Sequence, residues 1–100
     1  MRVSEYLPKG AKSAKTSREL RESLHLTDNE LRIAIRAERM RGVLICSRTR
    51  TDEYGQAGYF LPVTASELLE TIKSLRSRER EIQRVRKALE KGYKQQYGDE

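Results

Sequence analysis

Apolar residues recur at three- and four-residue spacing in three separate stretches of this 100-residue chain, which indicates three amphipathic helices. The first stretch carries Leu20 and Leu24, the second carries Leu31, Ala34 and Ile35, and the third begins after residue 64. Each stretch follows a threonine that has a glutamate three residues later, which is the pattern of a capping box. The three pairs are Thr16 with Glu19, Thr27 with Glu30, and Thr64 with Glu67.

The same pattern predicts where these helices end. The first helix is expected to end near His25. The second is expected to end at Gly42, because glycine just after a helix adopts the left-handed conformation at little cost. Two short helices separated by so brief a turn have the spacing of a helix-turn-helix. A long third helix is predicted over 64–92, since nothing interrupts that stretch before Gly92, and a frayed tail is expected over 93–100.

Between the second and third helices the pattern changes to that of β-structure. Two short runs rich in β-branched and aromatic residues, 43–46 and 59–61, flank a polar, turn-prone stretch. Two strands around such a loop form a hairpin, and a hairpin directly after a helix-turn-helix is a wing. The chain is therefore predicted to be mainly α (α+β): a winged helix-turn-helix domain over 1–63, with a two-stranded β-hairpin wing, followed by the long C-terminal helix.

Composition narrows the class of protein. The chain has 21 basic and 15 acidic residues, and its net charge of +6 favours a polyanionic partner. The longest uncharged stretch, 54–66, is too short and too broken by glycine and proline to span a bilayer. The first five residues lack the apolar segment of a secretion signal, and the lone Cys46 excludes an intramolecular disulfide. We therefore expect a soluble, cytoplasmic protein with no membrane partner.

The outward side of the second helix carries side chains suited to reading DNA. At 100° per residue, the side opposite the apolar stripe holds Asn29, Arg32, Ile33 and Arg36, with Arg39 at its margin. Arginine can fork onto guanine, asparagine onto adenine, and an apolar group can touch a thymine methyl. The alternative is an ordinary solvated helix face. The neighbouring helix and hairpin favour DNA, because a winged helix-turn-helix presents this face to the major groove.

Two flanking segments are candidates for phosphate contacts. In the predicted wing, Arg48 and Arg50 can reach phosphates or a minor groove, although Asp52 and Glu53 in the same loop oppose this. At the start of the first helix, backbone N–H groups favour phosphate, and ordinary capping with surface lysines is the alternative. The residues concerned there are Lys12, Lys15, Thr16, Ser17 and Arg18.

Candidate catalytic and metal-binding residues are few. The only histidine, His25, lies in the turn between two helices and has no partner at a meaningful spacing. Cys46 lies in a predicted buried strand, where a free cysteine behaves as a small hydrophobic residue. Gly55 and Gly58 fit a hairpin turn and not a phosphate loop. We therefore expect no enzyme activity, no metal and no cofactor.

Several segments resemble those of a known class of winged-helix proteins. They are Thr16-Ser17-Arg18-Glu19-Leu20, Leu31-Arg32 with Ile35, Glu38-Arg39 with Gly42 and Ile45, and Gly58-Tyr59-Phe60-Leu61-Pro62. The arrangement is similar to the N-terminal DNA-binding domain of biotin repressors. It more closely resembles small winged-helix proteins encoded by phages and prophages of Gram-positive bacteria, which share an opening like Leu7-Pro8-x-Gly10 and a stretch like Ser77-Arg78. The resemblance implies a DNA-binding protein acting in phage replication or transcription control, in the bacterial host cytoplasm.

The predicted C-terminal helix has two apolar stripes. The first, at Leu68, Leu69, Ile72 and Leu75, is expected to pack on the domain. The second extends too far for that, so it would either pair two copies into a homodimer or project and dock another protein. It comprises Ile82, Val85 and Leu89, and Glu79 and Arg86 at neighbouring positions weaken a strict coiled coil.

Two functions follow from these observations. In the first, the protein binds duplex DNA with a recognition helix over about 28–41. In the second, it is a protein-interaction adaptor that uses a winged-helix scaffold and the C-terminal helix. The arginine-rich outward face favours DNA, because an adaptor surface is more often apolar.

Overall fold

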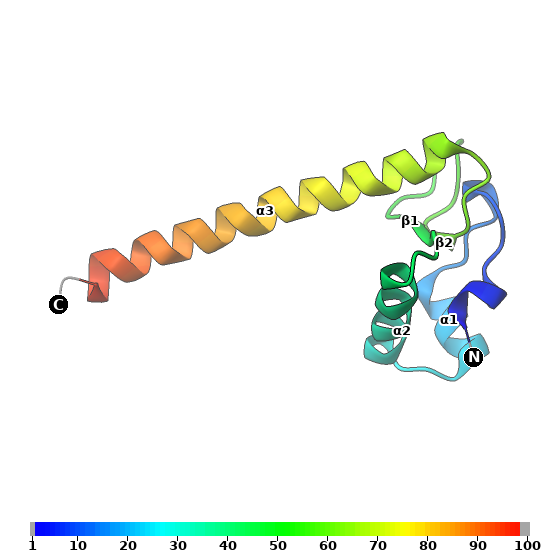
Figure 1. The fold of residues 1–100 in the computed structure, drawn as a ribbon, viewed down its shortest axis with the longest axis horizontal. Helices are drawn as coiled ribbons and strands as arrows, with labels where there is room; N and C mark the ends of the chain where they lie inside the picture. Colours follow the sequence, from blue (N-terminus) through cyan, green and yellow to red (C-terminus); the bar gives the residue numbers. More distant parts are fainter. Residues whose placement is uncertain (1, 99–100) are drawn as a thin grey trace.

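The computed structural model describes residues 2–98 and is mainly helical, with one two-stranded antiparallel sheet and a long C-terminal helix (Figure 1). The elements are two short 3-10 helices, Val3–Tyr6 and Ala11–Ser13, then α1 (Ser17–Leu24), α2 (Asp28–Met40), β1 (Cys46–Arg48), β2 (Gly58–Phe60) and α3 (Ala65–Tyr97). Residues 1, 99 and 100 lie outside the described part, so the predicted tail over 93–100 is tested only as far as Gly98. Among residues 2–98, no helix combines the length and apolar character needed to cross a membrane.

The predicted caps of α1 and α2 are confirmed. Thr16 accepts a hydrogen bond from the Glu19 N–H at 3.1 Å, and the Glu19 carboxylate accepts one from the Thr16 N–H at 3.0 Å. The same reciprocal pair forms at the start of α2. His25, with φ of 55°, ends α1, and Gly42, with φ of 93°, follows the end of α2 as expected. Local sequence signals therefore set both helices.

The main core lies between α1, α2 and the N-terminal segment. Leu20, Leu24, Leu31 and Ile35 are buried there, as their spacing predicted, and they pack with Val3, Leu7 and Ile45. Glu38 of α2 is also buried, at 4% exposure. Its carboxylate accepts hydrogen bonds from the Val3 N–H at 2.6 Å and from the N–H and hydroxyl of Ser4. The Glu38 side chain thus holds the N-terminal segment against α2 by hydrogen bonds.

The hairpin forms with its strands slightly displaced from the predicted runs. β1 pairs with β2 so that Cys46 lies opposite Phe60, and Ile45 belongs to the main core instead of the strand. The segment before α1 also pairs with the sheet: the Lys15 N–H donates to the Tyr59 carbonyl at 3.0 Å. A Cβ at Gly58, whose φ is 133°, would overlap the backbone carbonyl of Lys15. This close approach requires glycine.

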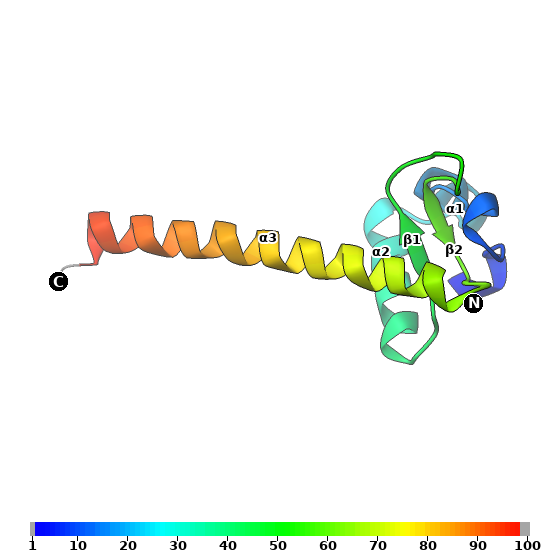
Figure 2. The same cartoon turned by 90° about the horizontal axis from the view of Figure 1, so that it is seen from above.

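α3 is longer than predicted and touches the domain along a narrow line. It runs through Gly92 to Tyr97, so the expected end at Gly92 is wrong. A single glycine inside a helix costs only about 1 kcal/mol relative to alanine, which the flanking helix-forming residues can offset. In Figures 1 and 2, α3 starts beside the hairpin, crosses β1 and then extends far from the domain.

The expected packing of the first apolar stripe of α3 is confirmed only for Leu68, which packs on a small cluster of Ala11, Ala14, Cys46 and Phe60. Leu69 is 62% exposed, and Ile72 and Leu75 are each more than a third exposed. The buried residue of α3 is Thr71, whose hydroxyl accepts the Ser47 N–H at 3.2 Å. This polar contact with β1 fixes the rotation of the helix and turns Leu69 outward.

Candidate nucleic-acid interface

The outward face of α2 is accessible, as its periodicity predicted. Asn29, Arg32, Ile33 and Arg36 are all exposed on the side opposite the buried Leu31 and Ile35. Arg32 lies 3.3 Å from Asp28, a surface ion pair one helical turn away. Such exposed pairs contribute little, so the Arg32 guanidinium can exchange this partner for another anion.

Arginines from two helices surround one groove beside α2. Arg32, Arg36 and Arg39 line it from α2, Tyr59 lines it from β2, and Arg78 lines it from α3. Ile35 and Met40 complete the lining, so no acidic residue faces this groove. Four guanidinium groups around one space raise the local positive potential, which is relieved by a bound anion.

Arg39 differs from the other arginines because it is half-buried. Its Nε donates to the Ile45 carbonyl at 3.0 Å, and its Nη2 lies 3.5 Å from the Ser47 hydroxyl. Burial lowers the pKa of this guanidinium from its ordinary value. Arg39 therefore links α2 to β1 and adds charge to the groove wall, whereas Arg32 and Arg36 are free to reach outward.

A second groove adjoins the first and is rich in hydroxyl groups. Tyr59 and Arg78 line both grooves, so together they form the boundary between them. The remaining lining residues are Thr16, Ser17, Ser47, Arg48, Thr49, Ala57 and Gly58. The N–H groups of Ser17 and the next residue, at the start of α1, have no acceptor within the helix. Hydroxyls, backbone N–H groups and two arginines together suit a phosphate.

The α1 terminus is only partly available for a phosphate. The Thr16 hydroxyl is engaged with Glu19, and the pKa of the Glu19 carboxyl is lowered by hydrogen bonds from Thr16, so an anionic group already occupies the cap. Lys15 and Arg18 do not line the groove, and Arg18 lies 3.2 Å from Glu22 on the exposed face of α1. Of the predicted residues in this segment, Ser17 is the one best placed to contact a phosphate in the second groove.

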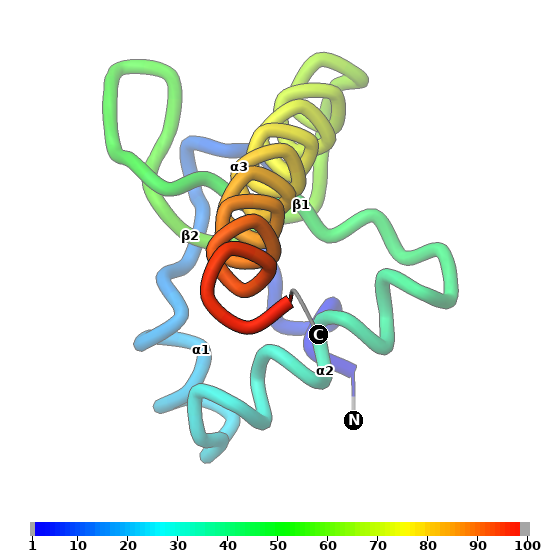
Figure 3. The backbone as a smooth tube through the Cα atoms, turned by 90° about the vertical axis from the view of Figure 1, so that its left-hand side faces the viewer, coloured from blue at the N-terminus to red at the C-terminus, as the bar shows by residue number. Residues whose placement is uncertain are grey.

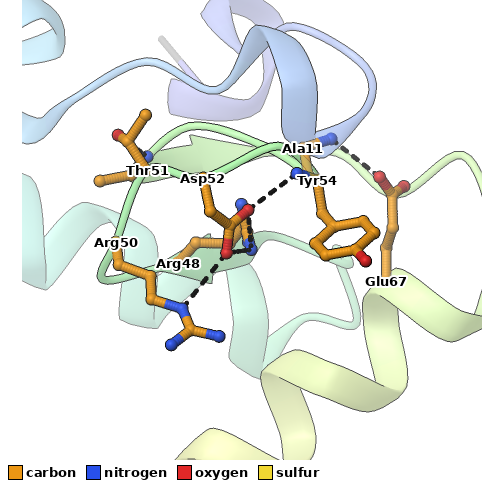
Figure 4. Close-up of polar contacts among 8 residues, drawn as sticks. Ala11, Arg48, Arg50, Thr51, Asp52, Tyr54 and Glu67 are labelled. Carbon is orange, nitrogen blue, oxygen red and sulfur yellow. Dashed lines mark hydrogen bonds and ion pairs between the residues drawn. The ribbon is translucent and has the colours of Figure 1, made fainter.

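In the hairpin loop, residues 49–57, an acidic residue organises the structure (Figure 4). Both carboxylate oxygens of Asp52 lie 3.1 Å from the Arg48 guanidinium, and one accepts the Tyr54 N–H at 2.8 Å. The Tyr54 N–H and the charges of Arg48 and Arg50 lower the pKa of Asp52. The Arg48 side chain is only 14% exposed and is held by Asp52, although it lines the second groove, and the phosphate contact predicted for it stays a prediction. Arg50, at 82% exposure, still faces solvent.

Arg78 and Tyr59 line both grooves, and the sequence patterns did not indicate either residue as a candidate. Arg78 follows the buried Thr71 by one heptad, so it lies on the face of α3 that is turned toward the domain. Neither residue belongs to one of the apolar stripes, so helical periodicity did not indicate them. Figure 3, viewed along α3, shows α1 and α2 below this helix and the hairpin loop to its left.

No metal site accompanies these grooves in residues 2–98, where no three His, Cys, Asp or Glu side chains are grouped to hold an ion. Cys46 is fully buried, and burial raises the pKa of its thiol. Comparisons with protein-family models, with curated proteins and with solved structures found no match to this chain.

Proposed function

We propose that this protein binds duplex DNA as a winged helix-turn-helix domain, with α2 in the major groove. The observation that carries the proposal is the groove bounded by Arg32, Arg36, Arg39 and Arg78, which no acidic residue lines. Four cations in one place favour a polyanion over a small neutral ligand. The exposed Asn29 and Ile33 on the same helix add groups that can contact base edges.

The second groove supports the same proposal because it offers contacts for the neighbouring phosphates. Ser17 and Thr49 provide hydroxyls there, and Arg78 is shared between the two grooves. A duplex bound to α2 would therefore have part of its sugar–phosphate backbone near Arg78 of α3. The resemblance to phage and prophage winged-helix proteins supports a role in replication or transcription control.

A fluorescence-anisotropy titration of a labelled duplex tests this proposal. We expect affinity to fall with salt, with a log–log slope of about −3 to −4 if four phosphates are neutralised. Arg36→Glu should weaken binding by about tenfold or more, because it places a carboxylate among the remaining arginines. Arg41→Glu is the matched control: it makes the same charge change just after α2 and outside both grooves. Equal affinities for the two variants would overturn the proposal.

A protein-interaction adaptor is the second candidate, and the large exposed side chains of α3 favour it. Ile82 and Leu89 are 68% and 70% exposed. An adaptor would show no salt-dependent duplex binding, and Arg36→Glu would leave its partner binding intact. The titration therefore separates the two functions.

A further inference from the structure

The outer half of α3 carries an apolar stripe that nothing in the structure covers. From Glu79 to Tyr97 every residue except Gly92 is exposed. Within this half, Ile82, Val85, Leu89 and Tyr93 recur once per turn on one side, each between 54% and 70% exposed. A stripe this narrow, with about one apolar residue per turn, is typical of a helix-pairing seam.

The base of the same helix face is already occupied by the domain. Ile82 and Leu89 follow Leu68 by two and three heptads, and Val85 follows Thr71 by two, so all five share one side of α3. Leu68 and Thr71 pack against the hairpin and its neighbours. A parallel partner helix would have to run through the space that the domain fills. Only a partner running in the opposite direction can reach the outer stripe along its length.

The stripe matches itself when it is reversed. The pairs Ile82 with Tyr93 and Val85 with Leu89 are centred on nearly the same point of the helix, close to residue 87. In an antiparallel pair, Ile82 therefore meets the partner's Tyr93, and Val85 meets the partner's Leu89. Tyr93 already stacks in a tilted arrangement with Tyr97, their rings 5.9 Å apart, so a broad apolar end faces the smaller Ile82.

The charges around the stripe also favour a second copy over a membrane or a nucleic acid. Three glutamates and one arginine border it: Glu79, Glu81, Glu90 and Arg86, which pairs with Glu90 at 2.6 Å. The glutamates would lie against anionic headgroups or phosphates if the stripe faced either. The basic residues of α3 lie mostly on the opposite side of the helix. Seven of the nine lie there, whereas Arg78 and Arg86 lie on or beside the stripe face. The seven are Lys73, Arg76, Arg80, Arg84, Lys87, Lys91 and Lys94. Self-pairing covers the apolar stripe and leaves these cations in solvent.

We propose that two copies of this chain associate through residues 79–97 of α3, with the helices antiparallel. Covering the stripe on both copies removes on the order of 1,000 Å² from solvent, the lower limit for a specific interface. Association is therefore expected in the micromolar range. The pairing does not depend on DNA, so it stands or falls separately from the proposed function.

Sedimentation equilibrium of the full chain, from about 1 to 300 μM, tests the association. We expect the mass to rise from one copy to two as the concentration increases. Leu89→Asp should hold the protein at the mass of one copy. Gln83→Asp adds the same negative charge to an exposed position away from the stripe, and it should dimerise like the wild type. A single-copy mass for the wild type throughout, or equal masses for the two variants, would overturn the proposal.

Spin labels on two matched positions test the direction of the helices. Ser77 and Ala88 are both exposed and lie three turns apart, so labels on Ser77→Cys and Ala88→Cys project to the same side. From the 1.5 Å rise per residue, an antiparallel pair centred near residue 87 separates the two labels along the helix axis by about 30 Å at 77 and by only about 3 Å at 88, so the measured distance is much longer at 77. Cys46 is buried, so the wild type under the same labelling serves as the blank. Equal distances at the two positions would show parallel helices and contradict the proposal.

Discussion

Replacing Glu38 by alanine should remove the hydrogen bonds that hold Val3 and Ser4 of the N-terminal segment against α2. The Glu38 carboxylate, which is almost fully buried, is the acceptor for the Val3 N–H and for both donors of Ser4. Removing it leaves the buried Val3 N–H without a partner, and the N–H of Ser4 must find water. Hydrogen bonds to charged groups contribute about 1.5–3 kcal/mol each, and an unsatisfied buried donor costs about 1–3 kcal/mol.

We expect Glu38→Ala to lower the free energy of unfolding by about 3 kcal/mol, because the part-buried Ser4 groups recover some solvation. In a domain of this size each kcal/mol shifts Tm by about 4–8 °C, so Tm should fall by about 12 °C or more. Thermal unfolding followed by circular dichroism measures the change. Urea unfolding at 25 °C gives the free energy independently.

Glu22→Ala is the matched control for this measurement. It makes the same truncation on α1, where the Glu22 side chain is 69% exposed and pairs only with the exposed Arg18. A surface pair of this kind contributes at most about 0.5 kcal/mol. If Glu38→Ala were no more destabilising than Glu22→Ala, the inferred role of the buried carboxylate would be refuted.

Four further substitutions test other features of the structure. Gly58→Ala, which forces a Cβ against a backbone carbonyl at positive φ, should lower the free energy of unfolding by about 3 kcal/mol, whereas Gly92→Ala, in open space on α3, should raise helicity. Thr71→Val should cost about 1–2 kcal/mol in urea unfolding, because the Ser47 N–H loses its acceptor. For Glu67, burial raises the pKa, but the N–H donors around it outweigh burial and lower the pKa overall. Its contribution is therefore present above the unfolded pKa and lost as pH falls through the folded one, so the stability gap between wild type and Glu67→Gln should narrow from pH 7 to pH 3.

Features set by neighbouring residues along the chain were predicted well from the sequence. Thr16, Glu19 and Leu20 act within one helical turn, so the start and inward face of α1 follow from local spacing. The outward face of α2 was predicted for the same reason, since burying Leu31 and Ile35 leaves the arginines outside.

Features that depend on how distant segments meet were not predicted. Nothing near Glu38 in the chain indicates that it accepts hydrogen bonds from residues 3 and 4. Arg78 lines both grooves because α3 crosses β1 with Thr71 held against Ser47, a contact between residues 24 positions apart. Arg48 is an intermediate case: Asp52 was visible as an opposing charge, but the burial of their ion pair depends on the packing of the hairpin loop.

The interface on α2 is tested most directly by NMR, with an unlabelled duplex titrated into the ¹⁵N-labelled protein at about 150 mM salt. We predict that amide shifts concentrate on Asn29 to Arg36, on Ser17 and on Tyr59, which face the two grooves or the exposed side of α2. Shifts confined to the outer half of α3, or no shifts at any duplex concentration, would contradict the assignment of α2 as the DNA-binding helix.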